Sequence, residues 1–104
     1  MAKFIYLYRG VVPDLTPKQG AERMAAFADW MEKLGPALLD AGSPFGASAS
    51  VRDDGSEGTA GDLIGYSILE ATDLSAAKAF TDGLPILSSS DGNCAVEIFE
   101  LLPM

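Results

Sequence analysis

Three short segments of the chain are rich in β-branched and aromatic residues and predict strands. They are 3–9 (KFIYLYR), 63–70 (LIGYSILE) and 95–102 (AVEIFELL). In the first and last segments, and less clearly in the middle one, apolar side chains occupy both alternating faces. Such a pattern is typical of a strand that is covered on both sides. A weaker segment, 47–52 (ASASVR), is compatible with a short second strand between the first and the middle one.

The strongest helix signal follows the first strand. Residues 16–19 (TPKQ) combine a capping threonine, a proline at the first helical position and a glutamine that completes a capping box. We expect a helix from Pro17 to Leu34, kinked or interrupted at Gly35-Pro36, with a stop signal at 42–44. Its apolar stripe recurs at spacings of three and four residues: Met24, Phe27, Met31, Leu34 and Leu38.

A second, shorter helix is predicted over 74–81, where Thr72-Asp73 supplies the N-cap. The polar, glycine-rich stretch 53–62 predicts a solvated loop or a long hairpin connection. The resulting order is βαββαβ. This order predicts an α+β fold, a ferredoxin-like sandwich in which two helices cover one face of a four-stranded antiparallel sheet. The length fits a single domain spanning residues 1–104.

The second face of this sheet has no predicted cover within the chain. Apolar side chains on both faces would expose a patch well above the ~300–600 Å² that is usual for monomers. The simplest remedy is a second copy that packs sheet to sheet. We therefore predict a homodimer.

Charge narrows the choice of partners. The chain has 15 acidic and 7 basic residues, which gives a net charge of −8. Such a surface repels phosphates, so we expect neither nucleic-acid binding nor docking on an anionic membrane. The chain contains no 18-residue apolar run and its first residues have no signal-peptide pattern, so we expect a cytoplasmic protein.

The chain has no histidine and one cysteine, Cys94. Serine–histidine–aspartate and cysteine–histidine catalysis are therefore excluded within the chain, and so are zinc sites of the Cys/His type. We expect no metal site and no cofactor. The acids of 53–62 lack the order of an EF-hand loop, which favours a solvated loop over a calcium site. Cys94 has no base or cation near it in sequence and is expected to be a small, partly buried residue.

Five residues are candidates for a binding site, and each also has a purely structural interpretation. Arg9 could clamp an anion or pair with an acid at the end of its strand. Trp30 could stack on a flat ligand or anchor the helix to the sheet. Tyr8 and Tyr66 could meet across the sheet and donate to a ligand, or be core residues. Phe45, next to glycines, could be a lid or a hydrophobic plug.

Three residues are the candidates for catalysis: Arg9, Tyr66 and Glu97. Glu97 alternates with apolar residues on the last strand. If its carboxyl group were buried without a partner, its pKa would rise and it could act as an acid or base. The alternative is an edge contact or a salt bridge.

The order and spacing of four blocks resemble the YCII-related proteins. The blocks are FIYLYRG (4–10), WMEKLGPALLDAGSPFG (30–46), GYSILEATDLSAAKAF (65–80) and VEIFELLPM (96–104). That family resembles the dimeric α/β-barrel superfamily, in which two ferredoxin-like protomers pack their sheets into one barrel. Some members carry a histidine and an aspartate suggested as a catalytic pair, a role that no residue of this chain can take over.

The resemblance implies a protein that binds or transforms a small organic molecule in a mainly apolar pocket. If the chain is an enzyme, isomerisation or a cofactor-free oxygenation would suit a pocket without histidine or metal. The alternative is a non-catalytic module that binds a small molecule or regulates another process. A third interpretation is an accessory subunit that contacts another protein through the acidic loop 53–62.

Overall fold

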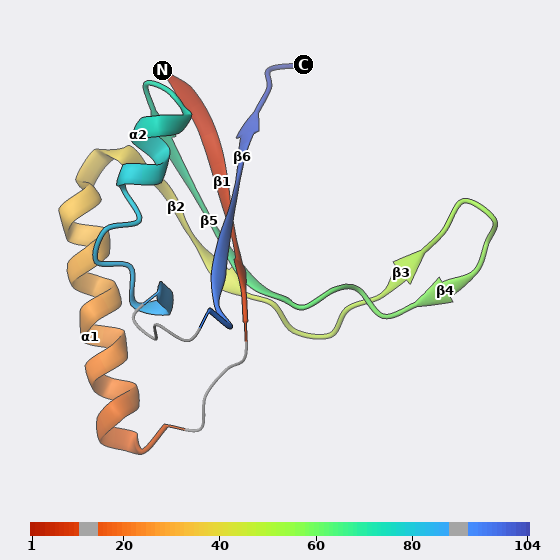
Figure 1. The fold of residues 1–104 in the computed structure, drawn as a ribbon, viewed down its shortest axis with the longest axis horizontal. Coiled ribbons are helices and arrows are strands. Elements are labelled where there is room, and N and C mark those ends of the chain that lie inside the picture. Colours follow the sequence, from red (N-terminus) through yellow and green to blue (C-terminus); the bar gives the residue numbers. More distant parts are fainter. Residues whose placement is uncertain (11–14, 88–91) are drawn as a thin grey trace.

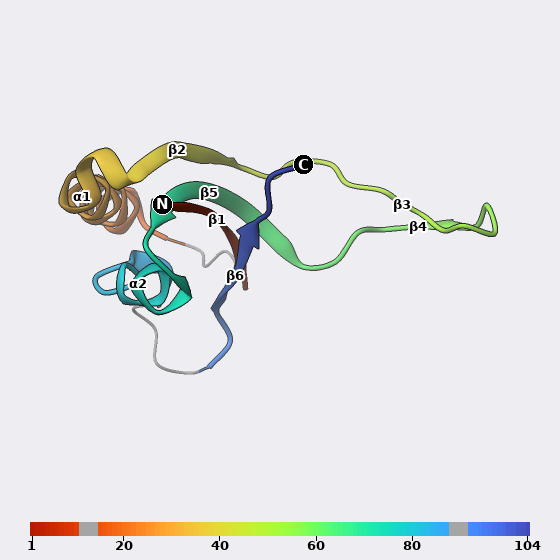
Figure 2. The same cartoon turned by 90° about the horizontal axis from the view of Figure 1, so that it is seen from above.

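The structure is a computed structural model that describes residues 1–10, 15–87 and 92–104 (Figure 1). Its centre is a four-stranded antiparallel sheet in the order β2-β5-β1-β6. The strands are β1 (Ala2–Arg9), β2 (Leu38–Pro44), β5 (Leu63–Ala71) and β6 (Ala95–Leu101). The helices α1 (Pro17–Leu34) and α2 (Leu74–Ala79) lie on the same side of this sheet (Figure 2). The predicted α+β class is confirmed, and the strand order is compatible with a ferredoxin-like fold.

The helix α1 begins and ends where its sequence predicts. The hydroxyl of Thr16 accepts a hydrogen bond from the Gln19 amide at 3.1 Å, and the Thr16 amide donates to the Gln19 side chain at 3.0 Å. These two bonds satisfy amide groups that the first helical turn leaves without a partner. At the other end, Gly35 has φ of +55°, and Pro36 follows it in the short 3-10 helix η1 (Gly35–Ala37). The helix therefore stops rather than kinks.

The prediction for the second strand of the sheet was wrong. That strand is β2, at Leu38–Pro44, and not the segment 47–52. Leu38 pairs with Leu69 of β5 instead of continuing the helical stripe, and 42–44 belongs to the strand instead of ending a helix. The error arose because Gly42 and Pro44 lower strand propensity. A bulge between Asp40 and Ser43 accommodates Gly42, and Pro44 is the last residue of this edge strand, where a proline is tolerated.

The segment between β2 and β5 forms an arm that leaves the body of the protein (Figure 1). Near its tip, β3 (Ser50–Val51) pairs with β4 (Glu57–Gly58) in a separate two-stranded sheet. The prediction of a long hairpin connection is thus confirmed. The radius of gyration is 15.2 Å, compared with about 13 Å for a compact chain of this length. An isolated two-stranded hairpin is only marginally stable in water, so the pairing of β3 with β4 adds little to the stability of the protein.

The hydrophobic core lies between the sheet and the helices. Phe4, Tyr6 and Tyr8 of β1 point into it, together with Trp30 of α1 and Leu69 of β5. The Tyr6 hydroxyl donates to the Ala77 carbonyl of α2, and burial raises its pKa. The remaining helical element is η2 (Pro85–Leu87), which packs against α1. The sequence of 88–93 (SSSDGN) also predicts a turn-rich loop, and most of it lies outside the described residues.

The opposite side of the sheet, which we call the open face, has no helix on it (Figure 2). Strand register places Ile5 and Leu7 of β1, Ile68 of β5 and Phe99 and Leu101 of β6 on this face. Phe99 is 55% exposed and Leu101 is 39% exposed. The expectation that the chain leaves an apolar sheet face uncovered is therefore confirmed.

Candidate functional site

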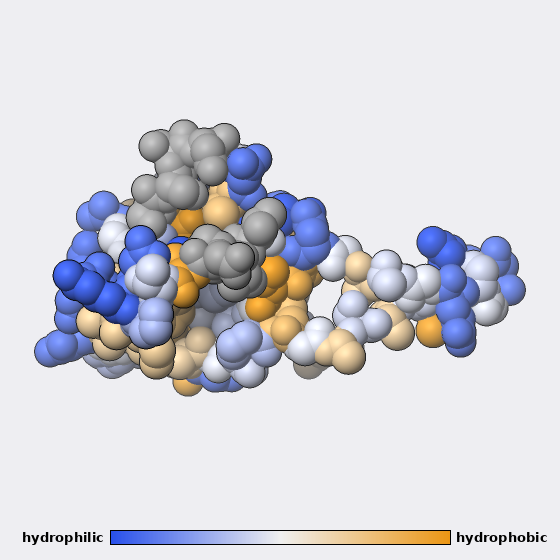
Figure 3. Space-filling view, turned by 90° about the horizontal axis from the view of Figure 1, so that it is seen from below, coloured by the Kyte–Doolittle hydropathy of each residue, from blue (hydrophilic) through white to orange (hydrophobic). Residues whose placement is uncertain are grey.

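A cavity of about 420 Å³ opens between α1 and the sheet. Its wall combines the backbone of β2 at 41–44 with apolar side chains from three other parts of the chain. These are Leu15, Phe27 and Met31 on or before α1, Ile64 on β5 and Ile86 in η2. Seen from below, apolar side chains gather around a hollow in the body, whereas the tip of the arm is mostly hydrophilic (Figure 3). The volume and lining suit a small organic molecule with a largely apolar body.

A chain of buried hydrogen bonds, which we call the hydroxyl relay, lies at one wall of this cavity. Tyr8 and Ala41 line the cavity, whereas Ser67, which connects them, does not. The Tyr8 hydroxyl donates to the Ser67 hydroxyl at 2.6 Å, and Ser67 in turn donates to the Ala41 carbonyl at 2.8 Å. Ser67 is completely buried. Burial raises the pKa of Tyr8, and the hydrogen bond to Ser67 offsets part of this rise. Tyr8 is thus a neutral phenol that is already hydrogen-bonded, and it ties β1 to β5 and β2.

The relay gives a measurable prediction for stability. Replacing Ser67 by alanine leaves the Tyr8 hydroxyl and the Ala41 carbonyl without their partner, so we expect a loss of about 1–3 kcal/mol. Urea denaturation followed by Trp30 fluorescence measures this loss. Ser43→Ala is the control, because Ser43 is exposed and its hydroxyl bonds only the neighbouring Pro44 carbonyl. Equal midpoints for the two variants would contradict the relay.

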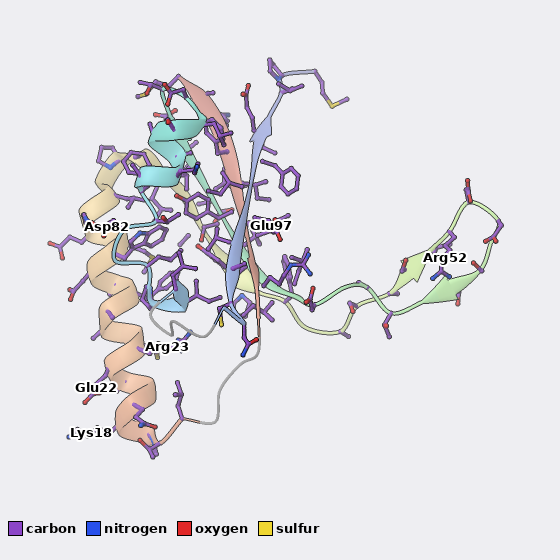
Figure 4. All side chains as sticks on the ribbon, in the orientation of Figure 1. Lys18, Glu22, Arg23, Arg52, Asp82 and Glu97 are labelled. Atoms are coloured by element: carbon purple, nitrogen blue, oxygen red, sulfur yellow. The ribbon has the colours of Figure 1, made fainter. Side chains whose placement is uncertain are left out.

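Arg23 is the one charged side chain among the described residues that line the cavity. It is half-buried on the side of α1 that faces the sheet, while Lys18 projects from the outer side of the same helix (Figure 4). Within the described ranges, no carboxylate lies within ion-pair distance of Arg23. The three ion pairs found there involve Arg9 and Lys33 instead. An arginine with no acidic partner among the described residues is unexpected in a chain with about twice as many acids as bases.

The two tyrosines proposed from the sequence both line the cavity, but they do not meet across the sheet. Strand register pairs Tyr8 with Gly65 and Tyr66 with Leu7. The two tyrosine side chains therefore point to opposite faces of the sheet. The Tyr66 hydroxyl donates to Asp40 at 3.2 Å, and the negative charge of Asp40 raises the pKa of Tyr66. The Tyr66 ring stacks on Phe45, with centroids 5.9 Å apart. Phe45 is 44% exposed and covers Tyr66 rather than the cavity.

Arg9 and Glu97 lie outside the cavity, and they contact each other. The Arg9 Nε donates to Glu97 Oε1 at 3.1 Å, and a second guanidinium nitrogen pairs with Asp62 at the base of the arm. The Arg9 and Glu97 side chains are 41% and 44% exposed. Glu97 therefore has a salt-bridge partner, as the alternative interpretation of its sequence position predicted. Such exposed pairs contribute at most about 1 kcal/mol.

Trp30 has the structural role that was one of its two interpretations: it anchors α1. Its indole nitrogen donates to the Phe80 carbonyl at 2.7 Å and thereby connects α1 to the end of α2. It is 2% exposed and does not line the cavity, but its ring lies 5.4 Å from that of Phe27, which does. Trp30 supports the cavity wall from behind.

The sequence predicts Phe27 and Met31 only as members of an apolar stripe, and it gives Arg23 no role. Arg23, Phe27 and Met31 recur every four residues, so they share one face of α1. A basic residue in line with an apolar stripe was the available signal. Ile64 and Ile86 join this face only through the tertiary fold, and nothing near them in sequence indicates a cavity.

Three other features of the described residues bear on the type of site. In the ranges 1–10, 15–87 and 92–104, no group of three or more acidic or cysteine side chains could hold a metal ion. A second, more polar groove runs between α1 and 81–87, and Glu22 and Asp82 contribute to it. No helix in the described part of the chain is long and apolar enough to cross a membrane.

No protein-family model, no curated protein and no solved structure matches the chain. Any statement about function therefore depends on the site itself.

Proposed function

We propose that this protein binds a small organic molecule in the cavity between α1 and the sheet, without catalysing a reaction on it. The observation that carries the proposal is a preformed space of about 420 Å³ with a mainly apolar wall. Filling it with an apolar ligand would bury the Phe27 and Met31 side chains further and gain hydrophobic free energy.

Binding is favoured over catalysis by the state of the polar groups. Tyr8 and Ser67 bond each other, and Ser67 bonds the backbone, so no acid or base at this wall is left to serve a substrate. Glu97, which would have been the general base, is paired with Arg9 outside the cavity. An isomerase-like or oxygenase-like reaction would need a proton-transfer group in the cavity. The remaining candidate, Tyr66, points to the opposite face of the sheet from Tyr8, and its hydroxyl donates to Asp40.

We further propose a YCII-related, ferredoxin-like protomer that forms a homodimer through its open face. The support is the strand order β2-β5-β1-β6, the two helices on one side and the four sequence blocks named above. Ile5 pairs with both Ile68 and Phe99 on this face, and Leu7 follows on the same strand, so apolar side chains of three strands lie next to one another. A second copy is the natural occupant, because a sheet packed on its own symmetry mate buries the same apolar surface twice.

The binding proposal is tested with N-phenyl-1-naphthylamine, a neutral apolar dye that fluoresces when it leaves water. We expect saturable binding to the wild-type protein. We expect this binding to be lost in Met31→Trp, because the bulky indole ring takes up space in the cavity that the slimmer methionine leaves open. Met24→Trp is the matched control, because it is the same change on the same helix at a side chain that is 76% exposed. Exciting the dye directly keeps the added tryptophan out of the signal.

Absence of binding, or equal binding by the two variants, would contradict the cavity as the site. Shifts of backbone amide resonances on adding the dye give a second readout. They are expected at Phe27, Gly42 and Gly65, which line the cavity, and not at Phe99 on the open face.

A further inference from the structure

Arg23 is a half-buried cationic side chain at the edge of an apolar cavity. Arg23 lines the cavity and no carboxylate among the described residues pairs with it. A guanidinium in such a place has lost part of its hydration without gaining an ion pair. It presents up to five N–H donors in a planar fork that matches two oxygens of one acidic group.

The second groove beside Arg23 does not supply the missing anion. That groove contains Glu22 and Asp82, and Asp82 pairs with Lys33 at 3.2 Å. Two carboxylates make the groove unfavourable for an anionic ligand. The cavity side, in contrast, has no acidic side chain among its described lining residues. An anion that meets Arg23 therefore enters from the cavity.

The size and charge of the site restrict the ligand further. The net charge of −8 repels anions in general, and more strongly those with a higher charge. One guanidinium can balance one negative charge, and the rest of the cavity wall offers apolar contacts from Phe27, Met31 and Ile64. The site thus fits a ligand with a single acidic group and a larger apolar body.

We propose that Arg23 binds the acidic group of an apolar monoanion, such as an aromatic or aliphatic carboxylate, whose body fills the cavity beside Phe27 and Met31. This inference rests on the proposed function and adds the class of ligand to it. Tyr8 and Ser67 do not contribute the anion contact, because their hydroxyls are engaged with each other and with the Ala41 carbonyl.

The test compares two dyes that share one ring system. N-phenyl-1-naphthylamine is neutral, and 1-anilinonaphthalene-8-sulfonate carries one negative charge. We expect the anionic dye to bind the wild-type protein about tenfold more tightly than the neutral dye, since a charged hydrogen bond replaces water. Arg23→Met keeps the aliphatic stem and removes the charge, so we expect it to abolish this advantage and to bring the ratio of the two dissociation constants to about one.

Two controls accompany this comparison. Arg52→Met removes the same charge from the arm, away from the cavity, and is expected to preserve the preference for the anion (Figure 4). Arg23→Lys retains a cation without the planar fork, and we expect it to restore part of the preference. Both dyes must be lost in Met31→Trp, which confirms that they occupy the cavity and not the open face.

The outcomes separate the two proposals. If both dyes bind in the cavity but Arg23→Met leaves their ratio unchanged, the role of Arg23 is overturned and the binding function stands. If neither dye binds, or if Met31→Trp affects neither, the proposed function itself is overturned. If the preference for the anionic dye disappears in Arg23→Met but persists in Arg52→Met, both the binding function and the role of Arg23 are supported.

Discussion

Replacing Gly42 by alanine is expected to lower the free energy of unfolding by more than about 3 kcal/mol, a large part of the ~5–15 kcal/mol typical of a domain. Gly42 has φ of +81°, a conformation that side chains with a Cβ rarely adopt. A Cβ here would also overlap the Tyr66 carbonyl oxygen of the neighbouring strand. Because that neighbour is backbone, β2 would have to move away from β5.

The same substitution is expected to remove dye binding, since Gly42 belongs to the cavity wall and β2 supplies one side of it. Gly46→Ala is the matched control: it has no positive φ, and no atom lies within 4 Å of its added Cβ. Chemical denaturation at one fixed protein concentration measures both variants, because a dimer makes apparent stability depend on concentration. A Gly42→Ala protein with the wild-type midpoint would contradict the close pairing of β2 and β5.

Introducing a charge on the open face is expected to have the second large effect. Phe99→Glu places a carboxylate on the open face, in the proposed sheet-to-sheet interface, beside Ile5 of the neighbouring strand β1. Its burial between two copies would leave the charge without a partner. We expect the dissociation constant of the dimer to rise about 30-fold or more, the effect of losing an interface hot spot of ~2 kcal/mol.

Sedimentation velocity over a range of concentrations measures this change. Leu74→Glu on α2 is the control, because Leu74 is 51% exposed, close to the 55% of Phe99, but lies on the helical side of the sheet. Both variants should fold, since neither side chain is buried within the protomer. A wild-type protein that sediments as a monomer, or a Phe99→Glu dimer as tight as the Leu74→Glu dimer, would overturn the dimer through the open face.

Local sequence determined the elements whose signals do not depend on distant residues. The capping box at Thr16 and the glycine at the end of α1 set its limits, and Asp73 begins α2 through a bond to the Ala76 amide at 2.8 Å. Alternating apolar residues located β1, β5 and β6 within one residue of their ends. These patterns also predicted an uncovered apolar face, because alternation alone decides which side chains share one side of a strand.

Tertiary structure alone decided where the second strand lies and which residues meet in the cavity. The segment 38–44 has a glycine, a serine and a proline, and it becomes a strand because its backbone pairs with β5. The sequence could nominate Tyr8 and Tyr66, but it could not show that Ser67 engages Tyr8 or that Asp62 and Glu97 hold Arg9 away from the cavity. Arg23 gained its significance in the same way. A charged residue on a helix is ordinary until the fold places it beside an apolar cavity where no described acid lies within ion-pair distance. The sequence pattern records the type of each side chain but not the partners that packing brings within reach.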